Sequence, residues 1–188
     1  MQRLFFTSDQ HFGHKNILRY CNRDFNSVHD MNVELTRAWN DTVGPNDWIA
    51  LLGDLTMNLK KIPSILQSLN GHKVYIPGNH DSRAEGVIRA WEKQNGQKLV
   101  ERCSPLISHN VNGQVIVMCH YAMRVWDRSH HGSIQVYGHS HASLPPEGRQ
   151  IDVGVDNAFR LLGEYRPFSL EEVLRLVPKE PLKNHHEK

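Results

Sequence analysis

The stretch that decides the fold is Leu4-Phe5-Phe6-Thr7-Ser8-Asp9-Gln10-His11, near the start of a chain of 188 residues. Its first four residues form a short apolar run, which predicts a buried β-strand. Asp9 and His11 follow directly and lie two positions apart, so their side chains leave an extended segment on the same side and can meet one ion. The chain therefore begins with a predicted strand that delivers a carboxylate and an imidazole at its end.

The same arrangement recurs further along the chain. The other predicted strands of this kind span 48–52, 74–76, 114–119 and 134–137, the third of them forming a hairpin with 106–110 around Asn112-Gly113. The clusters that follow these strands are Gly53-Asp54, Gly78-Asn79-His80-Asp81, His120 and Gly138-His139-Ser140-His141. Each cluster alone is a weak signal, but polar side chains gathered at strand ends are where α/β proteins build their sites. The five clusters together predict a single site.

The remaining segments predict how the strands are covered. Apolar residues at helical spacing predict helices over 27–44, 59–69 and 84–91, and a further strand is expected at 151–155 before a final helix that ends at Leu176. Ser27 and Ser169 each begin a capping box at a helix start. The first half thus alternates strands and helices, whereas the second half is predicted to be mainly antiparallel β. This order predicts an α/β fold of two packed sheets with helices outside, in one domain over 1–177, followed by a polar tail at 178–188 that contains His185 and His186.

Composition excludes several classes of protein. The chain has 22 Lys and Arg against 20 Asp and Glu, a net charge of +2 that gives no overall indication of a nucleic-acid or membrane partner. No apolar stretch is long enough to span a membrane, and residues 1–6 are too short for the apolar part of a signal peptide. The three cysteines show no paired spacing, so we expect a cytoplasmic protein without disulfides. The 13 histidines are a surplus that a tag, a pH switch or metal chemistry would explain.

The residue types in the five clusters favour metal chemistry. The side chains able to bind metal are Asp9, His11, Asp54, Asn79, His120, His139 and His141. This set has carboxylate, imidazole and carboxamide groups but no thiolate, which suits Mn²⁺, Fe²⁺ or Zn²⁺ in a reactive site rather than a structural zinc site. Seven ligands are too many for one ion and about right for two ions that share a carboxylate.

As an ordered set, these motifs resemble those of the calcineurin-like metallophosphoesterases over residues 9–141, and Ser8–Asn16 is similar to a small bacterial and phage subgroup of that family. The resemblance implies a two-sheet α/β/β/α sandwich and two divalent ions (Mn, Fe, Zn or Ni, with Mn favoured). It implies that Asp9, His11 and His141 hold the first ion, that Asn79, His120 and His139 hold the second, and that Asp54 bridges both. His80 would then face the phosphoryl group, so that His80 and Asp54 are the predicted catalytic residues.

The predicted function is hydrolysis of a phosphate ester by water that two metal ions activate. A phosphodiesterase acting on a nucleotide or nucleic-acid-like substrate is preferred, with a phosphomonoesterase or protein phosphatase as the alternative. Residues 55–58 lack the arginine expected of the protein-phosphatase version, which weakens that alternative. A non-catalytic scaffold of the same fold is a third hypothesis, disfavoured because every ligand and His80 are present.

Substrate contacts are harder to predict. His14, Arg83 and Arg124 lie close in sequence to the motifs and are candidates for binding the substrate. A solvated position is an equal alternative for His14 and the preferred one for Arg83. The segment 121–131 is rich in aromatic and basic residues and could line a nucleotide pocket, but we favour a surface loop with Trp126 turned inward. Asp152, Asp156 and Asn157 are interpreted as a turn after the last strand rather than as metal ligands.

Overall fold

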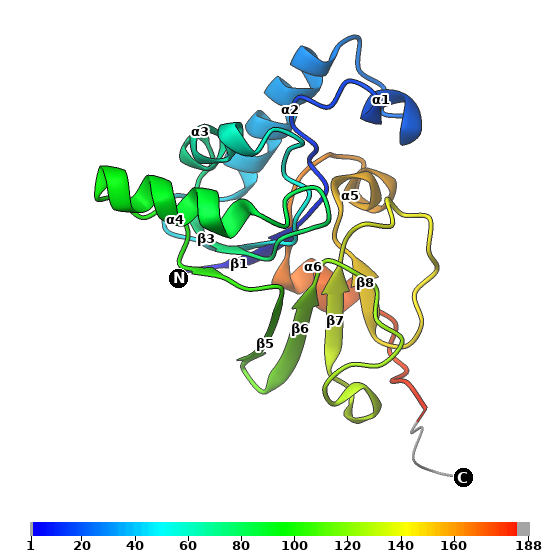
Figure 1. Cartoon of the computed structure of the whole chain (residues 1–188). Coiled ribbons are helices and arrows are strands. Elements are labelled where there is room, and N and C mark those ends of the chain that lie inside the picture. The colour runs from blue at the N-terminus through cyan, green and yellow to red at the C-terminus, as the bar shows by residue number, and fades with distance from the viewer. Residues whose placement is uncertain (1, 184–188) are drawn as a thin grey trace.

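A computed structural model describes residues 2–183 and shows two β-sheets packed face to face (Figure 1). The predicted two-sheet α/β sandwich is confirmed. Of the predicted polar tail, residues 178–183 form no helix or strand, and the rest, with His185 and His186, lies outside the described residues.

The first sheet carries the alternating half of the chain. Its strands, in spatial order, are β4 (Arg102–Cys103), β3 (His72–Tyr75), β2 (Trp48–Leu51), β1 (Leu4–Thr7) and β9 (Phe168–Ser169). β1 to β4 run parallel and β9 pairs antiparallel with β1. Because parallel strands end at the same edge of a sheet, the polar clusters after β1, β2 and β3 are delivered to one place.

The second sheet consists of β5 (Leu106–Val111), β6 (Gln114–Cys119), β7 (Ile134–Tyr137) and β8 (Gln150–Asp152). The predicted hairpin is confirmed as β5 and β6, but the prediction of a mainly antiparallel second half is wrong, since β6, β7 and β8 run parallel. Parallel neighbours need a crossover of about a dozen residues or more. The connections 120–133 and 138–149 are long enough, but they carry no helical spacing that would have revealed a crossover.

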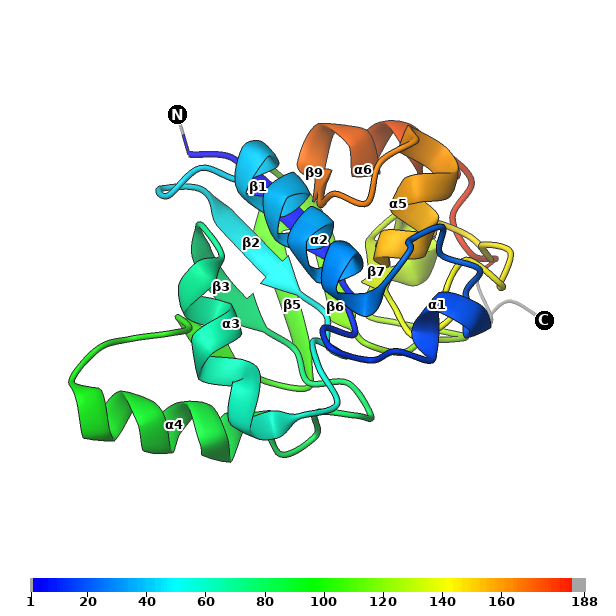
Figure 2. The ribbon, with the colours of Figure 1, turned by 90° about the horizontal axis from the view of Figure 1, so that it is seen from above.

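Alternation along the strands of the first sheet separates two apolar layers. On the outer face, Phe5, Ile49 and Leu51 pack against helices α2 (Val28–Thr42), α3 (Ile62–Ser68) and α4 (Ala84–Asn95), which lie together on that side of the sheet (Figure 2). On the inner face, Phe6, Ala50, Leu52 and Ile76 pack against Ile116, Met118, Ile134 and Val136 of the second sheet. α6 (Leu170–Leu176) borders this inner layer and begins at the predicted capping box of Ser169.

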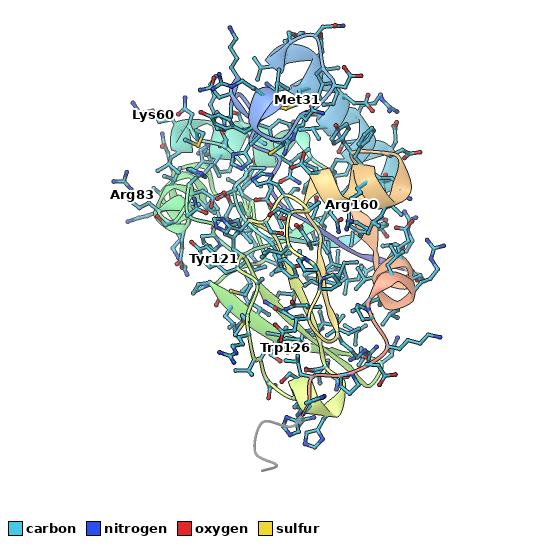
Figure 3. All side chains as sticks on the ribbon, turned by 90° about the vertical axis from the view of Figure 1, so that its right-hand side faces the viewer. Met31, Lys60, Arg83, Tyr121, Trp126 and Arg160 are labelled. Atoms are coloured by element: carbon cyan, nitrogen blue, oxygen red, sulfur yellow. The ribbon has the colours of Figure 1, made fainter. Side chains whose placement is uncertain are left out.

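A loop covers the outer face of the second sheet. The buried Gln135 side chain donates to the Tyr121 carbonyl (2.8 Å) and accepts from the Met123 amide (3.0 Å). Trp126 is buried and donates to the Ser133 carbonyl (3.3 Å), which confirms that its ring is turned inward. Tyr121 and Trp126, both labelled in Figure 3, come from this one loop, but the Tyr121 ring is exposed whereas the Trp126 ring is buried. The loop contains a single 3₁₀ turn, η2 (Ser129–His131), and a similar turn, η1 (Leu59–Lys61), precedes α3.

Two helices were not predicted from sequence. α1 (Ile17–Tyr20) is a single turn, too short to show a period. α5 (Val155–Leu162) begins where a strand was predicted over 151–155 and includes Asp156 and Asn157, so the predicted turn there is wrong. Within residues 2–183, no helix is both long enough and apolar enough to cross a membrane.

Candidate metal centre

The five predicted clusters meet at one edge of the sandwich, where β1, β2, β3, β6 and β7 end. Main-chain hydrogen bonds tie the clusters to one another. The Asp9 amide donates to the Gly53 carbonyl (3.0 Å), and the His11 amide donates to the Asp54 carbonyl (3.0 Å). The Gly138 amide donates to the His120 carbonyl (2.9 Å), which joins the two clusters of the second sheet. The predicted ligands are therefore carried by a network of loops rather than by separate flexible ends.

Asp54 lies in the middle of the assembled side chains. Its Oδ2 atom is 3.6 Å from Nε2 of His11 and 3.6 Å from Nε2 of His120, which come from different sheets. Its Oδ1 atom accepts a hydrogen bond from the His80 amide (3.0 Å). One carboxylate oxygen is thus fixed by the main chain while the other faces imidazoles on two sides, the arrangement that a bridging ligand requires.

Two groups of ligand atoms adjoin at Asp54. In each group, the atoms able to bind an ion lie within 4.8 Å of one another; the first group is Asp9, His11 and His141, and the second is Asp54, His120 and His139. Asn79 joins the second group, since its Oδ1 atom is 3.1 Å from Nε2 of His120. The structure thus brings together all seven predicted ligands, grouped as the family resemblance implies.

Buried ligand atoms without a partner test whether a cation fits here. Oδ1 of Asp9 and both ring nitrogens of His11 are buried and form no hydrogen bond with any residue in 2–183. Burial raises the pKa of Asp9 to about 7 and lowers that of His11 to about 2, so the site as it stands disfavours charge on both side chains. A divalent cation would offset the burial of the Asp9 carboxylate and take up the free lone pairs, so the residues present fit a metal.

Two histidines are oriented by hydrogen bonds at their other nitrogen. Nδ1 of His120 lies 2.6 Å from the Leu52 carbonyl, an acceptor, so this nitrogen carries the proton and Nε2 keeps its lone pair toward Asp54. Nδ1 of His141 lies 2.6 Å from Oδ2 of Asp156, with Nε2 4.0 Å from Oδ1 of Asp9. Burial alone would lower the pKa of His141, but contacts with Asp156, Cys21 and Asp9 raise it to about 10.

Arg23 and Asp156 support the centre; Arg23 was not identified from sequence, and Asp156 was interpreted only as part of a turn. The buried Arg23 guanidinium donates to both carboxylate oxygens of Asp156 (2.7 and 2.8 Å) and to the main-chain carbonyls of Asp9 (2.7 Å) and Gln10 (2.9 Å). It thereby links the loop after β1 to the acceptor of His141. Lying outside any motif and far apart in the chain, the pair leaves no local signal in the sequence.

Asp81 fixes the turn that carries Asn79 and His80. This buried carboxylate accepts from the Gly78 amide (2.5 Å), the Leu55 amide (3.0 Å) and the Tyr75 hydroxyl. The three donors come from β3 and from the loops after β2 and β3. Asp81 therefore joins the loop after β2 to the loop after β3. Its position directly after His80 was the only sequence signal for this role.

The backbone is strained at several of the predicted ligands. Asp9, His11, Asp54, His139 and His141 all adopt positive φ, between 47° and 66°, a region that non-glycine residues seldom occupy. Gly78 and Gly138 allow equally close approaches, since an added Cβ would lie 2.2 Å from Oδ1 of Asp54 or 2.2 Å from Oγ of Ser8. Strain of this kind persists only where the surroundings enforce it, and it clusters at functional sites.

The remaining predicted site residues differ in whether they lie beside the centre. The His80 side chain is 38% exposed, and its Nε2 atom is 3.9 Å from Oδ2 of Asp54. The His14 ring lies 5.4 Å from that of His11, and burial lowers the pKa of His14. Arg83 and Arg124 are exposed and form no hydrogen bond or ion pair with another described residue. His14 and His80 therefore border the centre, whereas neither arginine contacts it.

Comparison with known proteins identifies relatives over almost the whole chain. The uncharacterized protein MJ1445 of Methanocaldococcus jannaschii is 32% identical over 189 residues, covering 95% of this chain and 93% of that protein. The chain belongs to the MJ1445 family. The Gene 66 protein of Mycobacterium phage L5 is 26% identical over 196 residues, which cover 90% of this chain and 94% of that protein. No family model matches the sequence.

One solved structure shares the fold of this MJ1445 family member. A protein of unknown function from Aquifex aeolicus, AQ665, superimposes with a TM-score of 0.68 and 20% identity, covering 94% of this chain and all of that chain. The E. coli phosphoesterase YfcE overlaps with a TM-score of 0.39 and 17% identity, and an overlap at that level indicates neither a shared fold nor a shared activity.

Proposed function

We propose that the chain is a metal-dependent phosphoesterase with two divalent cations at the ends of β1, β2, β3, β6 and β7. The observation that carries this proposal is the pair of ligand groups that adjoin at Asp54, with buried ligand atoms that have no partner within residues 2–183. Asp9, His11 and His141 would hold one cation, Asn79, His120 and His139 the other, and Asp54 both. When bound, two such ions lower the pKa of a water molecule and neutralise charge on phosphoryl oxygens.

His80 would act on the substrate rather than on the metal. Its amide is anchored to Asp54, while its imidazole is partly exposed beside the centre. From there it can donate a hydrogen bond to a phosphoryl oxygen or a proton to the departing oxygen, a contribution of about 10²- to 10⁴-fold to rate in comparable enzymes. We therefore propose His80 and Asp54 as the catalytic residues.

We propose Mn²⁺ as the preferred ion and a phosphodiester as the preferred substrate. The two candidate ligand groups, Asp9, His11 and His141 and Asp54, His120 and His139, include no thiolate. Their carboxylates suit Mn²⁺, whereas their imidazoles also suit Fe²⁺, Zn²⁺ and Ni²⁺, so metal reloading must compare these ions. A monoesterase is the alternative, and a matched pair of chromogenic mono- and diesters separates the two activities.

The experiment uses the full chain after removal of metal by a chelator. Reloading with Mn²⁺, Fe²⁺, Zn²⁺ or Ni²⁺ should raise the unfolding temperature, with about 2.7 kcal/mol gained at a free-ion concentration 100 times Kd, and should restore diester hydrolysis. Asp54→Asn should abolish hydrolysis and weaken binding at both sites. The matched control is Asp41→Asn, at an exposed carboxylate on α2 that pairs with Arg37. Metal binding that is unchanged in Asp54→Asn would refute the centre, and binding without turnover of any ester would refute the activity.

A further inference from the structure

Two exposed tyrosines border the centre through different histidines. The Tyr121 ring is 46% exposed, and its centroid lies 4.9 Å from the His139 ring and 5.0 Å from the His120 ring. The Tyr20 ring is 63% exposed, and its centroid lies 6.1 Å from the His14 ring, whose centroid lies 5.4 Å from that of His11. Because Nε2 of His11 and Nε2 of His120 are both 3.6 Å from Oδ2 of Asp54, a continuous series of contacts connects the two tyrosines through Asp54.

Neither ring belongs to the buried core of the described residues. Tyr75 and Tyr137 are almost fully buried and pack in the interior, where large apolar rings are commonly found. Tyr20 and Tyr121 instead leave about half or more of their surface in water, and neither hydroxyl makes a hydrogen bond to another residue in 2–183. Each therefore offers an aromatic face at the border of the candidate centre, where a substrate would extend beyond the metals.

One ring has an arginine against it, and the other has one three residues further along the chain. The Arg19 guanidinium lies 5.3 Å from the Tyr20 centroid, and the exposed Arg124 belongs to the same loop as Tyr121. Neither arginine forms an ion pair with a carboxylate of the described residues. Aromatic faces with unpaired cations beside them are how proteins bind single-stranded nucleic acid, because bases stack on the rings while cations neutralise the flanking phosphates. This local arrangement is compatible with the small net charge of +2.

We propose that the substrate is a linear oligonucleotide whose scissile diester lies at Asp54, with one neighbouring base stacked on Tyr20 and the other on Tyr121. This inference rests on the proposed phosphoesterase function and specifies its substrate. Water adds to phosphorus as the bond to one nucleoside oxygen breaks, so one fragment keeps a phosphate monoester and the other gains a hydroxyl group. A mononucleotide has no second base to reach the far ring, so two platforms favour a strand.

The test compares a dinucleotide diester with two analogues, each of which lacks one of the two bases. Tyr20→Ala and Tyr121→Ala should each raise KM for the full dinucleotide about tenfold or more, and neither should affect the analogue that lacks the base it stacks on. Tyr20→Phe and Tyr121→Phe keep the ring and should keep the KM. Phe159→Ala is the control, because Phe159 is also 46% exposed but stacks on Tyr165 rather than against the histidines of the centre.

A second measurement separates this inference from the proposed activity. Stacking of a dinucleotide that contains 2-aminopurine quenches its fluorescence, and this quenching should be lost in the two alanine variants whether or not the protein hydrolyses any ester. Unchanged KM and unchanged quenching in both alanine variants would overturn the inference. So would a cyclic mononucleotide hydrolysed faster than the dinucleotide without dependence on either tyrosine. Quenching that depends on the tyrosines in a protein inactive toward every ester would support the binding surface and refute the activity.

Discussion

Replacing Gly78 with alanine should damage the metal centre through the volume of a single methyl group. A Cβ atom at this position would lie 2.2 Å from Oδ1 of Asp54 and 2.8 Å from both the Asp54 amide nitrogen and Cε1 of His120. Favourable contacts of carbon atoms lie at about 3.5–4.0 Å, so the Asp54 carboxylate must move by about 1 Å. Two of the three neighbours are main chain or a packed ring, so the loops themselves must separate.

The size of the effect follows from this displacement. Added volume in a packed site costs about 1–3 kcal/mol, and the overlap with main-chain atoms places Gly78→Ala at the upper end. Changes to residues that merely support a ligand weaken metal binding about 10- to 100-fold. Because Gly78→Ala moves a ligand proposed to serve both ions, we expect a loss larger than 100-fold.

Gly86 provides a matched control in the same part of the chain. It lies in α4, is exposed, and has no atom within 4 Å of the position that a Cβ would take. Alanine in a helix is more stable than glycine by about 0.5–1 kcal/mol, so Gly86→Ala should stabilise the protein and leave metal binding unchanged. Glycine-to-alanine substitution is thus expected to lower the free energy of unfolding at position 78 and to raise it at position 86, eight residues away.

The assay is urea unfolding with a chelator present, followed by calorimetric titration with Mn²⁺. The expected order of stability is Gly86→Ala, then the unaltered protein, then Gly78→Ala, with metal affinity lost only in the last. If Gly78→Ala binds Mn²⁺ as tightly as the unaltered protein, then the close approach of Gly78 to Asp54 is not a constraint on the centre and the reasoning fails.

Three further predictions concern other contacts. Asp156→Asn should weaken Mn²⁺ binding about 10- to 100-fold by calorimetry, because it removes the carboxylate that accepts from His141 and pairs with Arg23; an unchanged affinity would show that Asp156 does not orient the ligand. Burial lowers the pKa of Lys73 from 10.5 to about 8, so between pH 8 and 10.5 the unfolded chain binds more protons at this lysine than the folded protein does. Lys73 should therefore make the free energy of unfolding rise with pH across that range. Lys73→Met should lack this rise when the two proteins are compared by urea unfolding at each pH. Phe6→Ala, between the two sheets, should lower the unfolding free energy by about 3–5 kcal/mol by chemical denaturation, and a loss below 1 kcal/mol would contradict the packing of that layer.

Local sequence was sufficient for the elements that carry the ligands. Strands such as Leu4–Thr7 are short apolar runs followed by a polar cluster, and the order of those clusters predicted that the seven candidate ligand side chains would lie together. Residue type and position along a strand decide such features, so they can be predicted without knowledge of tertiary contacts.

Features that depend on distant contacts could not be predicted in this way. The parallel pairing of β6 with β7 is decided by where a 14-residue connection crosses the sheet, and residues 120–133 have no period that reveals it. The pairing of Arg23 with Asp156 joins residues 133 positions apart, and either residue alone looks like a surface charge. The left-handed backbone at Asp9 and His141 is likewise imposed by surrounding loops rather than by the residues themselves.

The separation of Arg23 from Asp156 has a consequence for synthesis on the ribosome. Translation at about 5–20 residues per second needs roughly 7–27 s to cover the 133 positions between them. Throughout that interval the Arg23 guanidinium has no Asp156 carboxylate to meet, and over its last 15 positions His141 is present without the acceptor of its Nδ1 proton. The first three strands can therefore form while the nascent chain still lacks part of the proposed cation site. Metal loading should follow release of the C-terminal third of the chain, so a ribosome stalled before α5 should carry a protein that does not retain metal.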